Sequence, residues 1–255
     1  MDKGIIPIIM SGGLGTRMNS NIPKVLHEIS SFPMIVHILF NLEEFSKYRN
    51  LKQILIIVGK YKEEIKATIE KYIKLPYITY IEQIEPKGTG HAIKCCSDFL
   101  SQYKDCDSII LSGDVPLFSC SSMISLTNKL NKVRIVITEM NNPSGYGRIL
   151  INNNIFVRIK EHNDCSVEEL KIRKVNCGIY AFDVETLLKW INYIKNDNSK
   201  EEYYLTDIIE LIKCGENIDI ETIEITSDNQ HEIMGVNTIE QLHILEEKFL
   251  QSNLK

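Results

Sequence analysis

The chain has 255 residues, of which 44% are hydrophobic and 25% charged, and its formal net charge is −5. These are ordinary values for a globular protein, and the length permits one large α/β domain or two small ones with a sizeable core. The negative charge speaks against nucleic acid as the main partner, and no apolar run approaches the roughly 20 residues of a membrane span.

Short apolar runs alternate with helical patterns along the chain. Strands are predicted at residues 4–10, 53–58, 78–82, 108–111, 134–139, 148–151, 156–160, 175–182 and 220–225. Helices are predicted at residues 34–46, 63–72, 90–100, 120–130, 184–194, 205–213 and 238–251. In the first half, the strand–helix alternation predicts right-handed crossovers and a mainly parallel sheet with helices on both faces.

The second half has more strands for each helix. Three asparagines at 152–154 predict a hairpin turn. Pro7 predicts local irregularity in the first strand, because it cannot donate a ladder hydrogen bond. We expect one domain with two lobes, in which ligands bind beyond the carboxyl ends of the strands.

A glycine-rich loop follows the first strand, and two cations follow the loop. Gly12, Gly13 and Gly15 let the backbone turn tightly and bring its amides close to a ligand. Arg17 and Lys24 add positive charge nearby. Bare amides flanked by two cations suit a polyphosphate, and a plain turn between a strand and a helix is the alternative.

Two phosphate-binding motifs do not fit this loop. The dinucleotide-binding fingerprint needs glycine at its sixth position, where this chain has Met18, and the P-loop triplet Gly-Lys-Ser/Thr does not occur. If the loop holds phosphates, it therefore does so with another geometry.

Two oxygen-bearing side chains are candidate Mg²⁺ ligands. Asp114 follows a predicted strand, and one carboxylate together with substrate phosphates is a typical Mg²⁺ arrangement. Asn237 opens the last predicted helix and could supply a second ligand. Ordinary roles compete with both assignments. Asp114 also fits a turn, and Asn237 with Glu240 matches an N-cap signature.

Other polar residues are suited to recognising a base or a sugar. Gln83 offers both a donor and an acceptor, as base-edge recognition requires, and Gly88 permits close approach of a flat ring. The segments that contain Glu161 and Asn176 could hydrogen-bond sugar hydroxyls. A surface glutamine, a helix start and ordinary polar loops are the alternatives.

The motifs together resemble those of sugar nucleotidyltransferases. They are similar to the uridylyltransferase half of the bacterial bifunctional N-acetylglucosamine-1-phosphate uridylyltransferase/glucosamine-1-phosphate acetyltransferase. The match covers nearly the whole chain. The matching motifs are Gly-x-Gly-Thr-Arg-Met (13–18), Pro-Lys-Val-Leu-His (23–27), Gly-Thr-Gly-His-Ala (88–92), Gly-Asp-Val-Pro-Leu (113–117), Gly-Tyr-Gly-Arg-Ile (145–149), Glu-His (161–162), Glu-Tyr-Tyr-Leu-Thr-Asp-Ile (202–208) and Gly-Val-Asn (235–237).

The resemblance implies a Rossmann-like α/β fold with a small β-rich sugar-binding lobe. The nucleotide-binding part would span about 1–115, the sugar-binding part about 116–236 and a C-terminal helix 237–252. The implied reaction transfers a uridylyl group from UTP to N-acetylglucosamine-1-phosphate, releases pyrophosphate and uses Mg²⁺.

The resemblance also implies roles for individual residues. Arg17 would face the leaving pyrophosphate, and Lys24 would contact the reacting phosphates. Asp114 and Asn237 would hold Mg²⁺, which favours metal ligation over capping for Asn237. The other implied contacts are Met10, Ser11, Gly12, Gly13, Gly15, Thr16, Gln83, Gly88 and Thr89 to the nucleotide, and Gly147, Glu161 and Asn176 to the sugar.

The chain departs from the family pattern at three points. Ser11 and Gly12 stand where the family usually has alanine, and Ser112 stands where it often has tyrosine, which removes an aromatic wall from the pocket. The sequence stops at Lys255, without the β-helix that carries the acetyltransferase and the trimer contacts. We therefore expect no acetyltransferase activity, and a monomer or small homo-oligomer.

Three other functions are alternatives. A related enzyme would use another sugar phosphate or base, such as a glucose-1-phosphate uridylyl- or thymidylyltransferase. A non-catalytic nucleotide-sugar-binding subunit would be expected to lack Arg17, Lys24 or Asp114, which are all present. A dinucleotide-binding dehydrogenase is disfavoured by Met18.

The seven cysteines are odd in number and include no Cys-x-x-Cys pair, which favours a reducing, cytoplasmic location.

Overall fold

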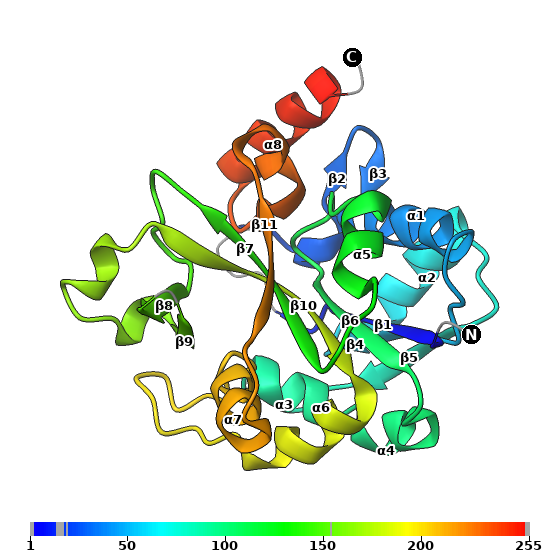
Figure 1. The fold of residues 1–255 in the computed structure, drawn as a ribbon. Helices are drawn as coiled ribbons and strands as arrows, with labels where there is room; N and C mark the ends of the chain where they lie inside the picture. The colour runs from blue at the N-terminus through cyan, green and yellow to red at the C-terminus, as the bar shows by residue number, and fades with distance from the viewer. Residues whose placement is uncertain (1–2, 14–17, 19, 154, 253–255) are drawn as a thin grey trace.

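A nine-stranded mixed sheet forms the centre of the computed structural model, which describes residues 3–13, 18, 20–153 and 155–252 (Figure 1). Its main strand order is β11-β7-β10-β6-β1-β4-β5. One half is parallel and consists of β1 (Ile5–Met10), β4 (Ile54–Val58), β5 (Ile78–Glu82) and β6 (Asp107–Ser112). The predicted fold class, a mostly parallel sheet with helices on both faces, is confirmed.

The second half of the sheet contains its antiparallel pairs. The long strand β10 (Lys174–Asp183) runs antiparallel to β6 and to β7 (Val133–Glu139), and β11 (Glu221–Ile225) pairs parallel with β7. A hairpin of β8 (Arg148–Asn152) and β9 (Ile155–Lys160) extends from β10. Asn152 pairs with Ile155, so the predicted hairpin turn is confirmed, although residue 154 lies outside the described part.

Helices cover both faces of the sheet (Figure 1). One layer contains α1 (Met34–Ser46), α2 (Lys62–Tyr72) and α5 (Cys120–Thr127). The other contains α3 (Thr89–Lys94), α4 (Ser97–Leu100), α6 (Val184–Trp190) and α7 (Asp207–Glu216). The last helix, α8 (Ile239–Ser252), lies near the short hairpin of β2 (Glu28–Ile29) and β3 (Phe32–Pro33).

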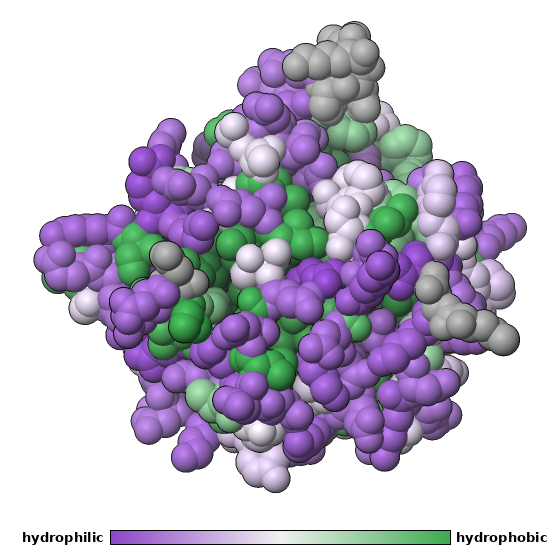
Figure 2. All heavy atoms as spheres, viewed as in Figure 1, coloured by the Kyte–Doolittle hydropathy of each residue, from purple (hydrophilic) through white to green (hydrophobic). Residues whose placement is uncertain are grey.

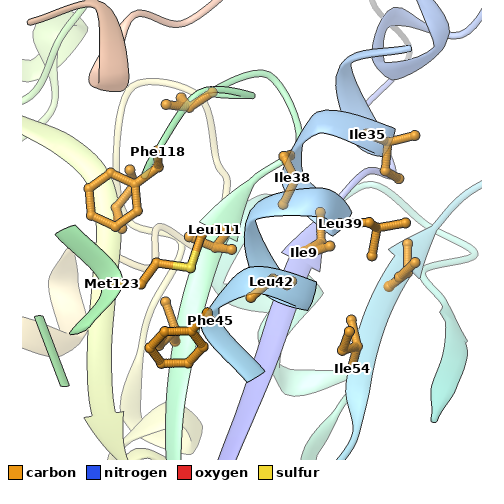
Figure 3. Close-up of a cluster of buried hydrophobic side chains, with 14 of the residues drawn as sticks. Ile9, Ile35, Ile38, Leu39, Leu42, Phe45, Ile54, Leu111, Phe118 and Met123 are labelled. Carbon is orange, nitrogen blue, oxygen red and sulfur yellow. The ribbon is translucent and has the colours of Figure 1, made fainter. Parts of the chain in front are cut away.

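Burial on both faces explains the unbroken apolar runs of the central strands. In β1, Ile5 and Ile9 join one core cluster, whereas Ile6 and Ile8 join the other. Both sides of a parallel strand are therefore removed from water, and its sequence need not alternate. Figure 3 shows side chains of α1 packed over the sheet, among them Ile35, Ile38, Leu39, Leu42 and Phe45, with Ile9, Ile54 and Leu111 from three strands.

Pro7 affects only one edge of β1. Pairing with β6 runs without interruption from Ile5 to Met10, whereas regular pairing with β4 begins only at Ile8. The amides of Ile5 and Ser11 donate on the β4 side, to Asn50 and Ile57. Alternate residues of a strand donate on the same side, so Pro7 would also donate towards β4, but it has no N–H. The expected irregularity is therefore present, and it is confined to this side.

Several predicted helices are shorter than expected. The predicted helix at 90–100 is divided into α3 and α4, because the Cys96 amide bonds to Ile93 instead of continuing the α-helical pattern. The predicted helix at 120–130 ends at Thr127, since Asn128 is extended and Lys129 has a φ of 50°. The predicted helix at 184–194 changes after Trp190 into a 3₁₀ turn.

The visible face is mostly hydrophilic, and apolar residues show mainly towards its middle (Figure 2). Within the described residues, the helices are too short or too polar for any of them to cross a bilayer.

Asp183 joins the sheet to helix α6 and gives a prediction on stability. Its carboxylate accepts hydrogen bonds from the Thr186 amide, at 2.9 Å, and from Lys3 Nζ, at 2.6 Å. Burial alone would raise the pKa of this carboxyl, but bonds from Lys3 and Thr186 outweigh burial and hold the pKa below its ordinary value. Asp183→Ala should therefore lower the free energy of unfolding by about 1–2 kcal/mol at pH 7.

Because the folded-state pKa is depressed, the contribution of Asp183 exists above the unfolded pKa and is lost on acidification. The difference between wild type and Asp183→Ala should narrow below about pH 4. Urea unfolding at several pH values measures it, with the exposed Asp197→Ala as control. A difference of the same size at pH 3 and pH 7 would contradict this account.

Gly215 leaves room for the only tryptophan of the chain, Trp190. A Cβ on Gly215 would overlap the Trp190 ring. Alanine normally stabilises a helix relative to glycine, by about 1 kcal/mol, but here the overlap should reverse the sign. Gly215→Ala should cost about 1–3 kcal/mol and change the tryptophan emission, whereas the neighbouring Cys214→Ala should do neither. Stabilisation by Gly215→Ala would show that the ring moves away without cost.

Candidate active site

The candidate site lies where the parallel strands end at one edge of the sheet. The Ser11 amide donates to Ile57 at 2.8 Å, and the Gly113 amide donates to Met10 at 3.0 Å. A Cβ on Gly113 would stand 2.8 Å from the Met10 carbonyl, so only glycine permits this approach of β1 and β6. The loops after these strands therefore meet, as expected for an open α/β sheet.

The first part of the glycine-rich loop lines a cleft at this edge. Met10, Ser11, Gly12 and Gly13 are among its lining residues. The predicted residues Gly15, Thr16 and Arg17 lie outside the described part of the chain. Just after them, Met18 is 2% exposed and belongs to a cluster with residues of α8. Met18, which excluded the dinucleotide fingerprint, is therefore a buried packing residue.

Lys24 lies between the two predicted metal ligands. It begins a 3₁₀ turn after Pro23, and its neighbour Val25 is buried in the core. The Lys24 Nζ atom is 2.5 Å from Asp114 Oδ2 and 3.2 Å from Asn237 Oδ1. The fold therefore brings together three predicted residues that are far apart in the sequence.

The Asp114 carboxylate is fixed by a second contact. Ser112 Oγ donates to Asp114 Oδ1 at 2.6 Å, while the Asp114 carbonyl accepts from the Val236 amide at 2.9 Å. In the sequence, Ser112 stands out only because it replaces an aromatic residue of the family. In the structure, its hydroxyl orients the Asp114 carboxylate. The backbone bond to Val236 places Asn237 beside the same site.

Helix α8 is capped one residue later than its sequence signature predicts. Thr238 Oγ1 accepts from the backbone N–H of Gln241 at 3.3 Å, and Gln241 Oε1 accepts from the backbone N–H of Asn237 at 2.7 Å. The alternative of an Asn237 cap is therefore wrong, because Thr238 performs that role. The Asn237 side-chain oxygen faces Lys24 instead.

Gln83 and Gly88 lie together at one end of the cleft. Gln83 is 8% exposed, and its Nε2 atom donates to the Gly88 carbonyl at 3.1 Å. Gly88 has a φ of +106°, and a Cβ there would stand 2.5 Å from the Tyr203 carbonyl, so this position requires glycine. Thr89 Oγ1 accepts from the Leu205 amide at 3.0 Å. The 203–205 segment thus holds the start of α3 in place.

Gly147, Glu161 and Asn176 lie together in a second compartment. The backbone N–H of Asn176 donates to the Gly147 carbonyl at 2.9 Å. Asn176 Nδ2 donates to the Tyr180 hydroxyl at 2.7 Å, and Thr206 Oγ1 donates to Glu161 Oε1 at 2.9 Å. Burial raises the pKa of the Glu161 carboxyl, although the Thr206 bond opposes the shift. The compartment is therefore polar, with Asn176 buried and Glu161 half-buried.

Some residues of this compartment carried no predicted role. Thr206 lines it, and Asp207 follows in the same Leu-Thr-Asp motif, which pointed to the family but not to a contact. Burial raises the pKa of Asp207 to about 6, and the nearby Glu161 carboxylate adds to the shift. Tyr146 lines the same compartment, and burial raises the pKa of its hydroxyl.

The two compartments form one continuous site. Met10, Thr89, Ser112 and Asp114 line both of them, so Asp114 lies at their junction. Among the described residues, Ser11 Oγ in one compartment and Asn176 Oδ1 in the other are buried without a hydrogen-bond partner. A buried polar atom without a partner is unfavourable, so each compartment is suited to a polar ligand.

The oxygen atoms around Lys24 fit a small divalent cation. Asp114 offers a carboxylate and Asn237 an amide oxygen, the hard ligands that Mg²⁺ takes, usually with waters and substrate phosphates completing its shell. The Lys24 ammonium lies within hydrogen-bond distance of both ligands, so this oxygen pair already accommodates a cation.

Comparisons with known proteins agree with this geometry. The family model described as "Nucleotidyl transferase" matches residues 6–227. A protein of Acanthamoeba polyphaga mimivirus, "Probable UDP-N-acetylglucosamine pyrophosphorylase", is 37% identical over 243 residues, which are 93% of each chain. "Bifunctional protein GlmU" of Clostridium botulinum is 37% identical over 241 residues. That match covers 92% of this chain and 50% of the bifunctional protein, so the chain spans half of that relative's length.

The fold also matches a solved structure. A UDP-glucose pyrophosphorylase complexed with UDP-glucose has a TM-score of 0.71 at 17% identity, over 99% of this chain and all of the other. At this identity the likeness concerns the fold alone. The family model and the two sequence relatives cover most of the described site, and the chain accordingly belongs to the nucleotidyl transferase family.

Proposed function

We propose that this nucleotidyltransferase transfers a uridylyl group from UTP to N-acetylglucosamine-1-phosphate, giving UDP-N-acetylglucosamine and pyrophosphate. The observation that carries the proposal is the two-compartment cleft with Asp114 at its junction and Lys24 bonded to Asp114. Such a site suits two substrates whose phosphates meet. The names of the mimiviral and clostridial relatives support the choice of substrates.

The Gln83 end of the cleft supports a uracil base. Because the Gly88 carbonyl can only accept, the Gln83 nitrogen is turned towards it and the Gln83 oxygen faces Gly12. A methyl group on Gly12 would stand 3.2 Å from that oxygen. Uracil presents an N–H between two carbonyl groups, and this N–H would donate to Gln83 Oε1. Cytosine has an acceptor at the same ring position.

The compartment of Glu161 and Asn176 supports a sugar with an amide substituent. Asn176 Oδ1 is an acceptor without a partner in the described part of the structure, and the half-buried Glu161 carboxyl lies in the same compartment. An acetamido N–H and ring hydroxyls are donors that would satisfy these oxygens. Glucose-1-phosphate has a 2-hydroxyl in place of the acetamido group, so it lacks the acetyl carbonyl and methyl, and a site shaped for that group would lose these contacts.

The reaction requires no protein nucleophile. A phosphate oxygen of the sugar phosphate would attack the α-phosphorus of UTP as the bond to the pyrophosphate oxygen breaks. The protein then contributes positioning and charge neutralisation. Mg²⁺ held by Asp114 and Asn237 would withdraw charge from the phosphate oxygens. Lys24 would turn from these two side chains towards the phosphates, and Arg17 would supply a further positive charge.

The first test concerns charge at the junction. Lys24→Ala and Asp114→Ala should each lower turnover by about 10²–10³-fold, because each removes a preorganised charge. Release of pyrophosphate from UTP, Mg²⁺ and N-acetylglucosamine-1-phosphate measures the rate. Lys66→Ala, on the surface of α2, is the matched control. Wild-type turnover in Asp114→Ala, with folding intact, would remove its proposed metal role.

The second test concerns the sugar. The wild-type protein should favour N-acetylglucosamine-1-phosphate over glucose-1-phosphate, and Asn176→Leu should reduce the ratio of their kcat/KM values about tenfold or more. The exposed Asn229→Leu should leave the ratio unchanged. Equal use of both sugar phosphates by wild type would contradict the sugar assignment and favour a glucose-1-phosphate enzyme. A panel of UTP and dTTP with each sugar identifies the alternative.

A further inference from the structure

His91 lies behind the base end of the cleft and contacts the residue proposed to read the base. It belongs to α3 and lines a separate pocket with Lys87, Lys94 and Tyr203. Its ring centroid is 6.4 Å from that of Tyr203, at an interplanar angle of 36°. Its Nδ1 atom is 3.2 Å from Gln83 Nε2. His91 is not among the lining residues of the nucleotide compartment, so its effect on a base would pass through Gln83.

The proton positions in this contact follow from chemistry. An amide nitrogen has two N–H donors and does not act as an acceptor. One N–H of Gln83 points to the Gly88 carbonyl, and the other points to His91 Nδ1. His91 must therefore accept at Nδ1 and carry its proton at Nε2 in this arrangement. Both donors of Gln83 are used, and its oxygen is left to face Gly12.

We propose that His91 is a positioning residue that fixes the direction of the Gln83 amide and thereby makes the enzyme prefer a uracil-type base to cytosine. This inference rests on the proposed uridylyl transfer. With only the Gly88 carbonyl to hold it, the amide would keep one bond instead of two, and it would turn more readily. A turned amide presents N–H to the cleft, which suits the ring nitrogen of cytosine and opposes the N–H of uracil.

Position 91 permits a matched pair of variants. Asparagine places an acceptor oxygen near the position of the histidine Nδ1 atom, whereas leucine has the same shape as asparagine and no acceptor. His91→Leu should lower the ratio of kcat/KM for UTP to that for CTP about tenfold, through a raised KM for UTP with kcat at saturating UTP retained. His91→Asn should keep the ratio near that of wild type.

A double variant separates positioning from general damage. Gln83→Leu should itself lower the ratio, and Gln83→Leu/His91→Leu should then show no further loss, because His91 acts only through Gln83. His91→Phe removes the acceptor but keeps a ring beside Tyr203, and it repeats the test if leucine disturbs packing. Cys95→Ala, on the turn after α3, is the control for local disturbance.

The outcomes distinguish this inference from the proposed function. If Gln83→Leu lowers the ratio while His91→Leu and His91→Phe leave it unchanged, the positioning role is overturned and uridylyl transfer stands. Additive losses in the double variant would also overturn it. A wild-type protein that does not use UTP would overturn the proposed function, and the role of His91 with it.

Discussion

The contact of Lys24 with Asp114 and Asn237 is the constraint on which the rest of the site depends. It joins a turn after the glycine-rich loop, the end of β6 and the start of α8. An ammonium and a carboxylate at 2.5 Å stabilise each other strongly only where solvent is limited, and both side chains are at least four-fifths buried. The fold itself therefore places these charges together, and binding of the proposed phosphate substrates would exchange one set of ionic partners for another.

The rigid edge of the sheet makes this contact possible. Gly113 lets β6 approach the Met10 carbonyl, and the Val25 side chain packs beside it, so the residues next to Asp114 and Lys24 pack against each other. Ser112 then restricts the second carboxylate oxygen. Side chains that are fixed by neighbours lose little freedom when a ligand arrives, which favours precise placement of the reacting phosphates. The buried cores on both sides of β1 and β4 support this edge.

The sequence was sufficient for the fold class and for most of the strands, because buried parallel strands leave apolar runs that are visible in the order of residues. It also placed candidate residues such as Gln83 and Asp114 after strand ends, and in the structure both line the cleft. It was insufficient wherever a distant segment decides the outcome. Thr238 and not Asn237 caps α8, and the Asn237 oxygen faces the distant Lys24. The bond from Ser112 to Asp114 is local, but residue type alone does not predict which way the hydroxyl of Ser112 points.

One segment connects the two compartments and bears on how they act together. The Tyr203 amide donates to the Lys87 carbonyl, and the Tyr203 carbonyl accepts from the Gly90 amide. These bonds hold the segment against the end of the cleft that contains Gly88. Three residues later, Thr206 donates to Glu161 in the proposed sugar compartment. Movement of Glu161 on sugar binding would therefore act on the same backbone that holds Gly88 and, through Gly88, Gln83. Because this segment is short and bonded at both ends, the proposed contacts to the base and to the sugar belong to one connected unit, and substitutions at either end are expected to affect the binding of both proposed substrates.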